Sequence, residues 1–274
     1  MAYKLDVIMI IKEQVIFGNK FIDLDNGYNI FYRDIHEANN FFVNCNKEIP
    51  FVLVSHNSDG KVTNKPTRFN VGSSNDANIM YIPSNLVHWY SQNICVNFKG
   101  LESIPIGLEN DVWFPKINKI DKIINKLQEI KNYQNLMYIC FNINNNIQQR
   151  EEPYRLFSNQ FWCTVENGIN GNNEYFNKYL DRIYNHKFVL CPEGNGTDTH
   201  RTWETLYVGS IPIEKRNINN SFYEGKLPIC FVDEWSEINE KFLNNEYNRI
   251  SNTDYNLDLL TIDYWKNKIK TTLI

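Results

Sequence analysis

The sequence lacks three features that would each assign it to a large class of proteins. No apolar run reaches the roughly 18 to 20 residues that a membrane-spanning helix needs, and the N-terminal VIMII stretch is too short for the core of a signal peptide. Lys and Arg number 28 against 32 Asp and Glu, so no excess of cations is available for the phosphates of a nucleic acid. We therefore expect a soluble, cytoplasmic protein that does not bind nucleic acid.

Cysteine is scarce and widely spaced. The six residues have neither the close pairs of a zinc site nor the density of a small disulfide-rich domain. They are Cys45, Cys95, Cys140, Cys163, Cys191 and Cys230. Buried free thiols are the expected state. Internal repeats and low-complexity linkers are also missing, and an aromatic content of 14% is too high for a disordered chain.

The 274 residues, 42% of them hydrophobic, are enough for two domains of ordinary size. In the first half, short runs rich in β-branched and aromatic residues alternate with polar segments, which predicts strands. These runs cover residues 3–11, 29–33, 49–55, 77–83, 94–98 and 103–108. The segment 83–93 lies between two of them and is interpreted as a short helix. Strands that alternate with helices indicate an open α/β sheet.

A different pattern follows Trp113. Isoleucines and Leu127 recur every three or four residues between Ile117 and Ile130, with charged residues between them, which predicts an amphipathic helix of about four turns. Strands are then predicted over 136–142, 187–192, 211–215 and 228–232, and helices over 173–185, 199–208 and 235–245. A polar segment with one Trp closes the chain.

These patterns predict the domain organisation. The N-terminal α/β domain covers residues 1–115, a linking helix covers 116–132, and a second α/β domain covers 133–260. We expect the closing segment, 261–274, to pack back on the first domain.

The most informative stretch is 186–213, HKFVLCPEGNGTDTHRTWETLYVGSIPI. A buried strand is followed by a loop with Gly194 and Gly196 and then by a helix. Small residues before a helix leave backbone N–H groups free for an anion, and the helix dipole adds roughly half a positive charge there. Arg201, in the first turn, supplies a guanidinium that matches phosphate oxygens. Glu204, three residues later on the same face, could accept hydrogen bonds from ribose hydroxyls.

The same stretch also fits a purely structural role. Gly194 and Gly196 would then only form a turn, and Arg201 and Glu204 would pair with each other on a solvent-facing surface. The loop matches neither GxGxxG nor GxxxxGK[ST]. Spacing alone does not decide between the two interpretations.

The stretch resembles the signature of exostosin-like glycosyltransferases. In that family a strand is followed by a Cys/Ser-Pro-Arg-Gly-Asn-Gly-type loop, then Asp-Thr-His-Arg-Thr-Trp-Glu, then a Gly-x-Ile-Pro-Ile strand. The runs SHNSD (55–59), LVHWYSQN (86–93), SIPIGLENDVW (103–113) and DEWSEI (233–238) follow the order of the family's small stand-alone members, some of them encoded by large DNA viruses. The similarity covers about residues 50–240. One departure is Glu193, which stands where the family commonly has Arg and leaves the donor's identity open.

The resemblance implies an α/β fold of GT-B type, with two Rossmann-like domains and the active site in the cleft between them. It implies inverting transfer of a sugar from a nucleotide sugar, UDP-linked by family expectation and for example UDP-xylose, to a hydroxyl of a glycan acceptor. No obligatory metal or other cofactor is expected. The second domain would hold the donor and the first domain the acceptor.

The donor-binding residues that the resemblance implies follow one another along the chain. They are Gly194, Asn195, Gly196, Thr197, Asp198, Thr199, His200, Arg201 and Glu204. Arg150 and Arg155 are candidates for a second phosphate contact. Solvent-facing ion pairs with Glu151 or Glu152 are the alternative role for these two arginines.

Inversion at an anomeric carbon needs a base opposite the leaving nucleotide. Asp59 fits this role because it follows the buried run FVLVS, and the alternative is an Asp-Gly turn in which it only caps the backbone. His56 is the second candidate, although a lone His beside a strand is more often structural. Glu109 and Asp111, after the IPIGL run, are next in line.

Three residues are candidates for the acceptor side. Asn57 and Asn93 could bind sugar hydroxyls and Trp89 could stack on a sugar ring, although aromatic residues at such spacing are usually part of a core. Asp23-Leu24-Asp25 formally matches the Asp-x-Asp metal motif of the other major glycosyltransferase fold. Three residues match by chance often, so we expect no metal.

Two further functions stay open on sequence alone. A non-catalytic carbohydrate- or nucleotide-binding protein could retain the same fold, and a nucleotide-sugar hydrolase or epimerase could use a similar scaffold. Asn195-Gly196-Thr197 is a formal N-glycosylation sequon inside the donor loop. Since a glycan there would obstruct the pocket, we expect the protein to work where that modification does not occur.

Overall fold

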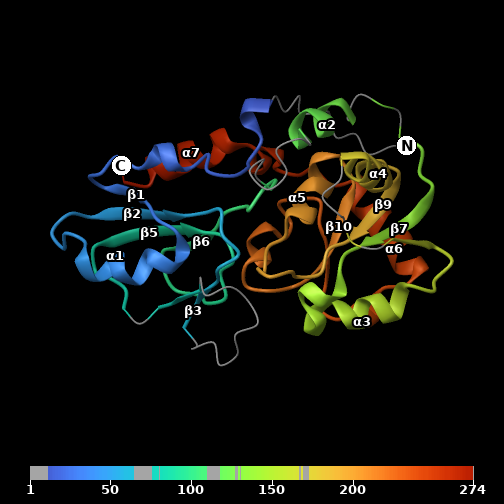
Figure 1. The fold of residues 1–274 in the computed structure, drawn as a ribbon, viewed down its shortest axis with the longest axis horizontal. Coiled ribbons are helices and arrows are strands. Elements are labelled where there is room, and N and C mark those ends of the chain that lie inside the picture. Colours follow the sequence, from blue (N-terminus) through green and yellow to red (C-terminus); the bar gives the residue numbers. More distant parts are fainter. Residues whose placement is uncertain are drawn as a thin grey trace.

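The computed structural model describes residues 12–64, 76–79, 81–109, 118–126, 129, 131–166, 168 and 173–273. These residues form an α/β structure with two main parallel sheets, which lie side by side in Figure 1. Within these ranges, no helix is long and apolar enough to cross a bilayer. All six cysteines are free, and Cys140, Cys191 and Cys230 are buried while the other three are half-buried.

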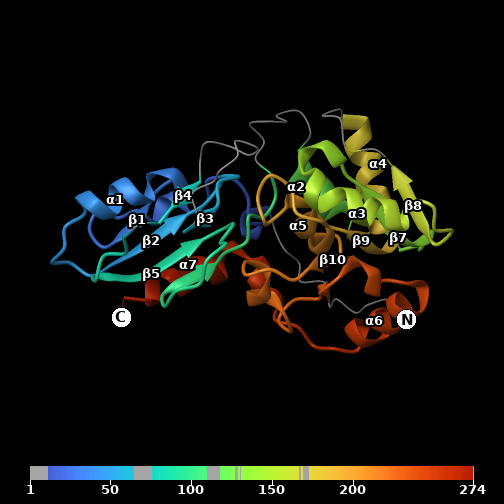
Figure 2. The ribbon, with the colours of Figure 1, turned by 90° about the horizontal axis from the view of Figure 1, so that it is seen from below.

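The first sheet has the strand order β1-β2-β5-β6, with every neighbour parallel. Its strands are β1 (Ile30–Tyr32), β2 (Phe51–Ser55), β5 (Leu86–Ser91) and β6 (Leu101–Ser103). Helices α1 (Ala38–Asn44) and α7 (Ile262–Thr271) lie on opposite sides of this sheet (Figure 2). Successive strand residues point to opposite faces, so Leu53 packs in the cluster with Phe42 of α1, and Val54 in the cluster with Trp265 of α7.

Residues 86–91 form a strand, so the helix predicted over 83–93 is wrong. Strand β5 pairs with β2 on one side and β6 on the other, and its aromatic and β-branched residues suit such a central position. The predicted strand 94–98 is also wrong, because only Ile94 forms an isolated bridge, to Val62. A small separate sheet pairs β3 (Val62–Thr63) with β4 (Ala77–Asn78).

The second sheet has the strand order β11-β10-β9-β7-β8, again entirely parallel. Its strands are β7 (Asn135–Cys140), β8 (Cys163–Glu166), β9 (His186–Leu190), β10 (Ile211–Lys215) and β11 (Cys230–Val232). Counted within this sheet the order is 2-1-3-4-5, a common doubly wound order whose direction reverses between its first and third strands. The reversal point therefore lies between β7 and β9.

Helices cover both faces of the second sheet. They are α3 (Ile147–Phe157), α4 (Asn173–Tyr184), α5 (His200–Tyr207) and α6 (Glu240–Ser251). Tyr138 of β7 belongs to the core cluster of α4 and α5, whereas its neighbour Met137 belongs to the cluster of α3 and α6. The first of these clusters also includes the α7 side of the first sheet, so the two sheets share one continuous core.

Helix α2 (Lys119–Lys126) spans about two turns and packs against α4. Ile117, Leu127 and Ile130 of the longer predicted helix lie outside the described residues, as do Trp113 and the predicted strand 3–11. The polar closing segment is helical in α7, and Thr272 and Lys268 hydrogen-bond to Tyr90 and Glu102 of the first sheet. The short 3₁₀ helices span Lys12–Gln14, Ile22–Leu24, Ile35–Glu37, Ile143–Asn145, Asn220–Tyr223, Trp235–Glu237 and Leu257–Leu260.

Candidate functional site

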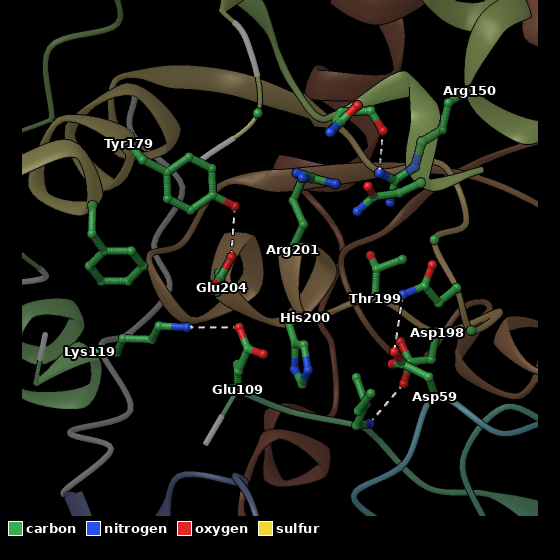
Figure 3. A pocket seen from close by; sticks show the side chains of 18 residues that line it. Asp59, Glu109, Lys119, Arg150, Tyr179, Asp198, Thr199, His200, Arg201 and Glu204 are labelled. Atoms are coloured by element: carbon green, nitrogen blue, oxygen red, sulfur yellow. Dashed lines mark hydrogen bonds and ion pairs between the residues drawn. The ribbon is translucent and has the colours of Figure 1, made fainter. Parts of the chain in front are cut away.

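A cavity of about 450 Å³ opens where the carboxyl ends of strands from both sheets meet (Figure 3). Asp59 and Glu109 reach it from the segments that follow β2 and β6, and Asn142 and Gly194 reach it from the loops after β7 and β9. Loops on either side of the reversal point between β7 and β9 thus face the cavity. This is the place where open α/β sheets bind ligands.

Most residues predicted to bind the donor come together here. The predicted donor residues that line the cavity are Arg150, Gly194, Asn195, Gly196, Asp198, Thr199, His200, Arg201 and Glu204. Thr197 and Arg155 are not among the lining residues. Thr197 turns its hydroxyl toward the Asn93 side chain, 3.5 Å away, and Arg155 is exposed on α3. The prediction that Arg155 contacts a phosphate in this cavity is therefore wrong.

Arg150 of α3 fixes the loops on both sides of the reversal point. Its Nε donates to the carbonyl of Glu193 at 2.9 Å, and its Nη1 donates to the carbonyl of Asn142 at 2.8 Å. A Cβ at position 194 would lie 2.8 Å from Arg150 Nη2, so a larger residue would push the guanidinium away from these contacts. Burial and the charge of Arg201 lower the pKa of Arg150 to about 10, which still leaves it protonated at neutral pH.

Arg201 has a buried donor without a partner. Its Nε is inaccessible to solvent and makes no hydrogen bond with any described residue. The guanidinium lies 5.8 Å from the centre of the Phe141 ring and interacts electrostatically with Arg150. A buried N–H left unpaired costs about 1–3 kcal/mol. Two neighbouring cations, one with an unsatisfied donor at the start of a helix, form a site suited to an anion.

Glu204 lies one turn further along α5 and is buried at 4% exposure. Its Oε2 accepts a hydrogen bond from the Tyr179 hydroxyl at 2.7 Å (Figure 3). Burial and the Glu204 charge hold the pKa of Tyr179 far above its usual value, so the hydroxyl stays a donor. The alternative of a solvent-facing Arg201–Glu204 pair is wrong, because Glu204 is buried and bonded to Tyr179.

Asp198 joins the loop between β9 and α5 to the segments that follow β5 and β6 of the first sheet. Its Oδ2 accepts from the backbone N–H of Ile106 and its Oδ1 from Nε1 of Trp203, both at 2.8 Å. Its own N–H donates to Oδ1 of Asn93 at 2.8 Å. Burial raises the pKa of Asp198 to about 6, against the lowering effect of these hydrogen bonds. The carboxylate therefore holds the loop against the segment that follows β6.

The candidates on the acceptor side are mostly structural. Trp89 is fully buried, donates from Nε1 to Ser55 Oγ at 3.0 Å, and packs edge-on against Phe42, so it cannot stack on a sugar. Asn93 is buried with its amide bonded to Ser58 and to the donor loop. A Cβ at position 196 would lie 2.5 Å from that amide, which explains the glycine there.

His56 and Asn57 also do not reach the cavity. The His56 ring is fully buried, with Nδ1 3.0 Å from the carbonyl of Gly18 and Nε2 2.8 Å from that of Pro105. Burial lowers the pKa of His56 to about 4. The prediction that His56 is a catalytic base is wrong, because both ring nitrogens contact backbone carbonyls and neither faces the cavity. Asn57 bonds to Asn19 at 2.7 Å outside the cavity lining.

Three side chains on the first-sheet side remain accessible to the cavity. Asp59 is exposed and accepts from Nδ2 of Asn195 at 3.2 Å, which links the two sheets across the cavity. Glu109 forms an ion pair with Lys119 at 3.2 Å. His200 is bound through Nδ1 to the carbonyl of Gly107 at 2.8 Å. Asp111, the other carboxylate considered, lies outside the described residues.

Sequence reasoning missed several lining residues. Asn142 and Asn145 lie in the segment after strand β7. Strand β7 borders the point where the strand order reverses, so knowledge of that order would have indicated these residues. Phe176 and Tyr179, one turn apart on α4, give only the apolar spacing of a core helix. Lys119 lies near the start of α2 and carries no local motif.

Carboxylates of the Asp-x-Asp match are engaged elsewhere. Asp23 pairs with Lys266 at 2.6 Å, and Asp25 pairs with Arg33 at 2.7 Å. Across the parts of the chain that the structure describes, no group of three or more His, Cys, Asp or Glu side chains is placed to hold a metal ion.

The chain was also compared with known proteins. Neither the models of known protein families nor the curated protein sequences yield a match to it. The functional conclusion therefore rests on the residues and geometry of the cavity.

Proposed function

We propose that this protein is an inverting glycosyltransferase that moves a sugar from a UDP-linked nucleotide sugar to a hydroxyl of a glycan acceptor. The observation that carries the proposal is the cationic end of the cavity. There, the buried unpaired Nε of Arg201 lies beside the charge of Arg150 at the start of α5. A diphosphate has the charge and the oxygen acceptors that this end lacks.

The rest of the cavity agrees with a nucleotide sugar. Glu204 has a carboxylate held by Tyr179, and its second oxygen is available to ribose hydroxyls. The backbone of the loop around Gly194 approaches the cavity closely because no side chain intervenes. These features match the roles that the exostosin-like resemblance implies for the same residues.

Both parallel sheets direct their carboxyl ends at one cavity, which supports a GT-B arrangement. In this arrangement the second sheet binds the donor and the first sheet the acceptor. Arg150 and Arg201 then stabilise the negative charge that develops on the departing diphosphate, which is where electrostatic catalysis has its largest effect. The base has to come from the opposite side of the cavity.

A thermal-shift panel of nucleotides and nucleotide sugars tests the proposal. A ligand at a hundred times its dissociation constant adds about 2.7 kcal/mol to the free energy of unfolding. We expect UDP and one UDP-sugar to raise the melting temperature, and we expect a much smaller response in an Arg201→Ala variant. Absence of a response to every nucleotide in the wild type would contradict the proposal.

A second measurement separates transfer from simpler activities. With the responding UDP-sugar, we expect fast UDP release only when a glycan acceptor is present. Release at the same rate without an acceptor would identify a hydrolase, and binding without turnover would identify a non-catalytic nucleotide-binding protein. Activity should persist in the presence of a chelator, and its loss with recovery on adding manganese would contradict a metal-independent transfer.

A further inference from the structure

His200 is the first residue of α5 and stands next to Arg201 in the cavity wall. Its ring contacts the carbonyl of Gly107 through Nδ1 at 2.8 Å. A carbonyl oxygen only accepts hydrogen bonds, so Nδ1 must carry the proton. In the neutral ring, Nε2 is then the nitrogen with the lone pair, and the backbone contact holds it in that tautomer.

The two neighbouring side chains leave the helix in opposite directions. Figure 3 shows Arg201 directed to the side of Arg150 and Tyr179, and His200 directed to the side of Glu109. The contact with Gly107 places the imidazole beside the segment that follows β6 of the first sheet. His200 and Arg201 thus face different parts of the same cavity.

We propose that His200 is the general base of the transfer and acts through Nε2, an inference that rests on the proposed function. In this step Nε2 takes the proton of the acceptor hydroxyl while its oxygen forms a bond to the anomeric carbon. The bond from that carbon to the phosphate oxygen breaks, and its electron pair leaves with UDP. The imidazolium then returns the proton to solvent.

The geometry favours His200 over Asp59 and Glu109, the two carboxylates that reach the cavity from the first sheet. The carboxylate of Glu109 is engaged in the ion pair with Lys119 at 3.2 Å. Asp59 is solvent-exposed and hydrogen-bonded to Asn195. The imidazole alone combines a fixed tautomer with a nitrogen lone pair that has no protein hydrogen bond among the described residues.

A matched pair of variants tests the assignment. His200→Asn places an amide N–H near the position of Nδ1, so the contact with Gly107 can persist while the basic Nε2 is removed. We expect its turnover of the responding UDP-sugar to fall by about 10²- to 10⁴-fold, with UDP affinity by calorimetry within threefold of wild type. His36→Asn is the control, because it makes the same substitution at an exposed histidine that does not line the cavity, and it should keep turnover within a few-fold.

The pH profile of turnover distinguishes a base from a positioning residue. We expect the acidic limb of the wild-type profile to be lost in His200→Asn, because the group that must be unprotonated is gone. The titratable and charged groups around the ring, which could contribute a limb of their own, are Asp59, Glu109, Asp198, Arg201 and His56. Turnover of His200→Asn near wild type, or an unchanged acidic limb, would overturn the assignment.

A chemical readout does not require the donor to be known. Diethyl pyrocarbonate acylates unprotonated imidazole nitrogens that are accessible. We expect mass spectrometry to find the adduct on His200 and on the exposed His36, and to find none on His56, whose nitrogens are both bonded. An unmodified His200 beside a modified His36 would show that Nε2 is not available and would overturn the assignment. Failure of UDP to bind the wild type would instead contradict the proposed function, so the two failures are distinguishable.

Discussion

The two sheets contribute to the cavity in different ways. The second sheet supplies most of it through one continuous stretch, in which strand β9, the loop and helix α5 follow each other directly. The first sheet supplies Asp59, Ile106 and Glu109 from two separate segments, and its polar candidates His56 and Asn93 are buried. A site built from a contiguous strand–loop–helix unit can be found in sequence, because local geometry places its groups. A site wall assembled from separate segments cannot be found in that way.

The largest expected effect is on stability, and it tests whether Trp89 of the first sheet belongs to the hydrophobic core or to an acceptor site. Trp89→Ala removes a fully buried indole that contacts Phe42 and Ser55. We expect the free energy of unfolding to fall by about 3–5 kcal/mol in a denaturant titration. UDP affinity of the folded fraction should be unchanged. A Trp89→Ala protein that is as stable as the wild type but binds the acceptor more weakly would contradict this prediction. Trp89 would then be part of the acceptor site and not of the core.

The second prediction contrasts Arg201 of α5 with Arg155 of α3. Arg201→Ala should lower UDP affinity by about 1.5–3 kcal/mol, the value of a charged hydrogen bond, in a calorimetric titration. Arg155→Ala changes an exposed arginine that does not line the cavity, so we expect no change in affinity. Equal losses in both variants would show that the contribution is a general surface charge and not a phosphate contact.

The third prediction concerns pH and a buried carboxyl beneath α5. Glu214 accepts hydrogen bonds from Thr202 and Asn220, and burial raises its pKa to about 8 from a usual 4.5. The folded protein therefore binds this proton more tightly than the unfolded chain. Its stabilising contribution is complete below about pH 4.5 and is lost as pH rises through 8.

Between these pH values each unit of pH should cost up to about 1.4 kcal/mol of stability through this group. Glu214→Gln keeps the shape without the titration, so its free energy of unfolding should vary less with pH between 6 and 8 than that of the wild type. Parallel curves for the two proteins would show that Glu214 is ionised throughout this range.

The smallest effect is expected at Asp59. Its contact with Asn195 is exposed, so Asp59→Asn should change the free energy of unfolding by no more than about 0.5 kcal/mol. With His200 as the base, turnover should stay within a few-fold of wild type. A loss of a hundredfold or more with unchanged UDP affinity would return the role of base to Asp59 and give the first sheet a catalytic group.

Sequence patterns predicted best those elements whose conformation is determined by residues close together in the chain. The strand at 187–192, the glycine loop and the helix at 199–208 were predicted within a few residues, because burial alternation, small residues and helix spacing all lie within one short segment. The prediction of a helix where strand β5 lies was wrong. The conformation of this segment depends on pairing with β2 and β6, which come from distant parts of the chain. Strand β8 was not predicted for the same reason, and helix α3 was not predicted because Pro153 stands inside it and most of its residues are polar.

The sequence by itself determined the α/β character, the unit from β9 to α5, and the presence of Arg201 and Glu204 in one helix turn. Only the tertiary structure decided that Arg150 serves the loop while Arg155 points away, and that His56 is enclosed while His200 keeps a nitrogen toward the cavity. The physical reason is that burial and hydrogen-bond partners set the state of a polar group. Those partners, here Gly107 for His200 and Pro105 for His56, lie in the segment that follows β6 and are far from the two histidines along the chain.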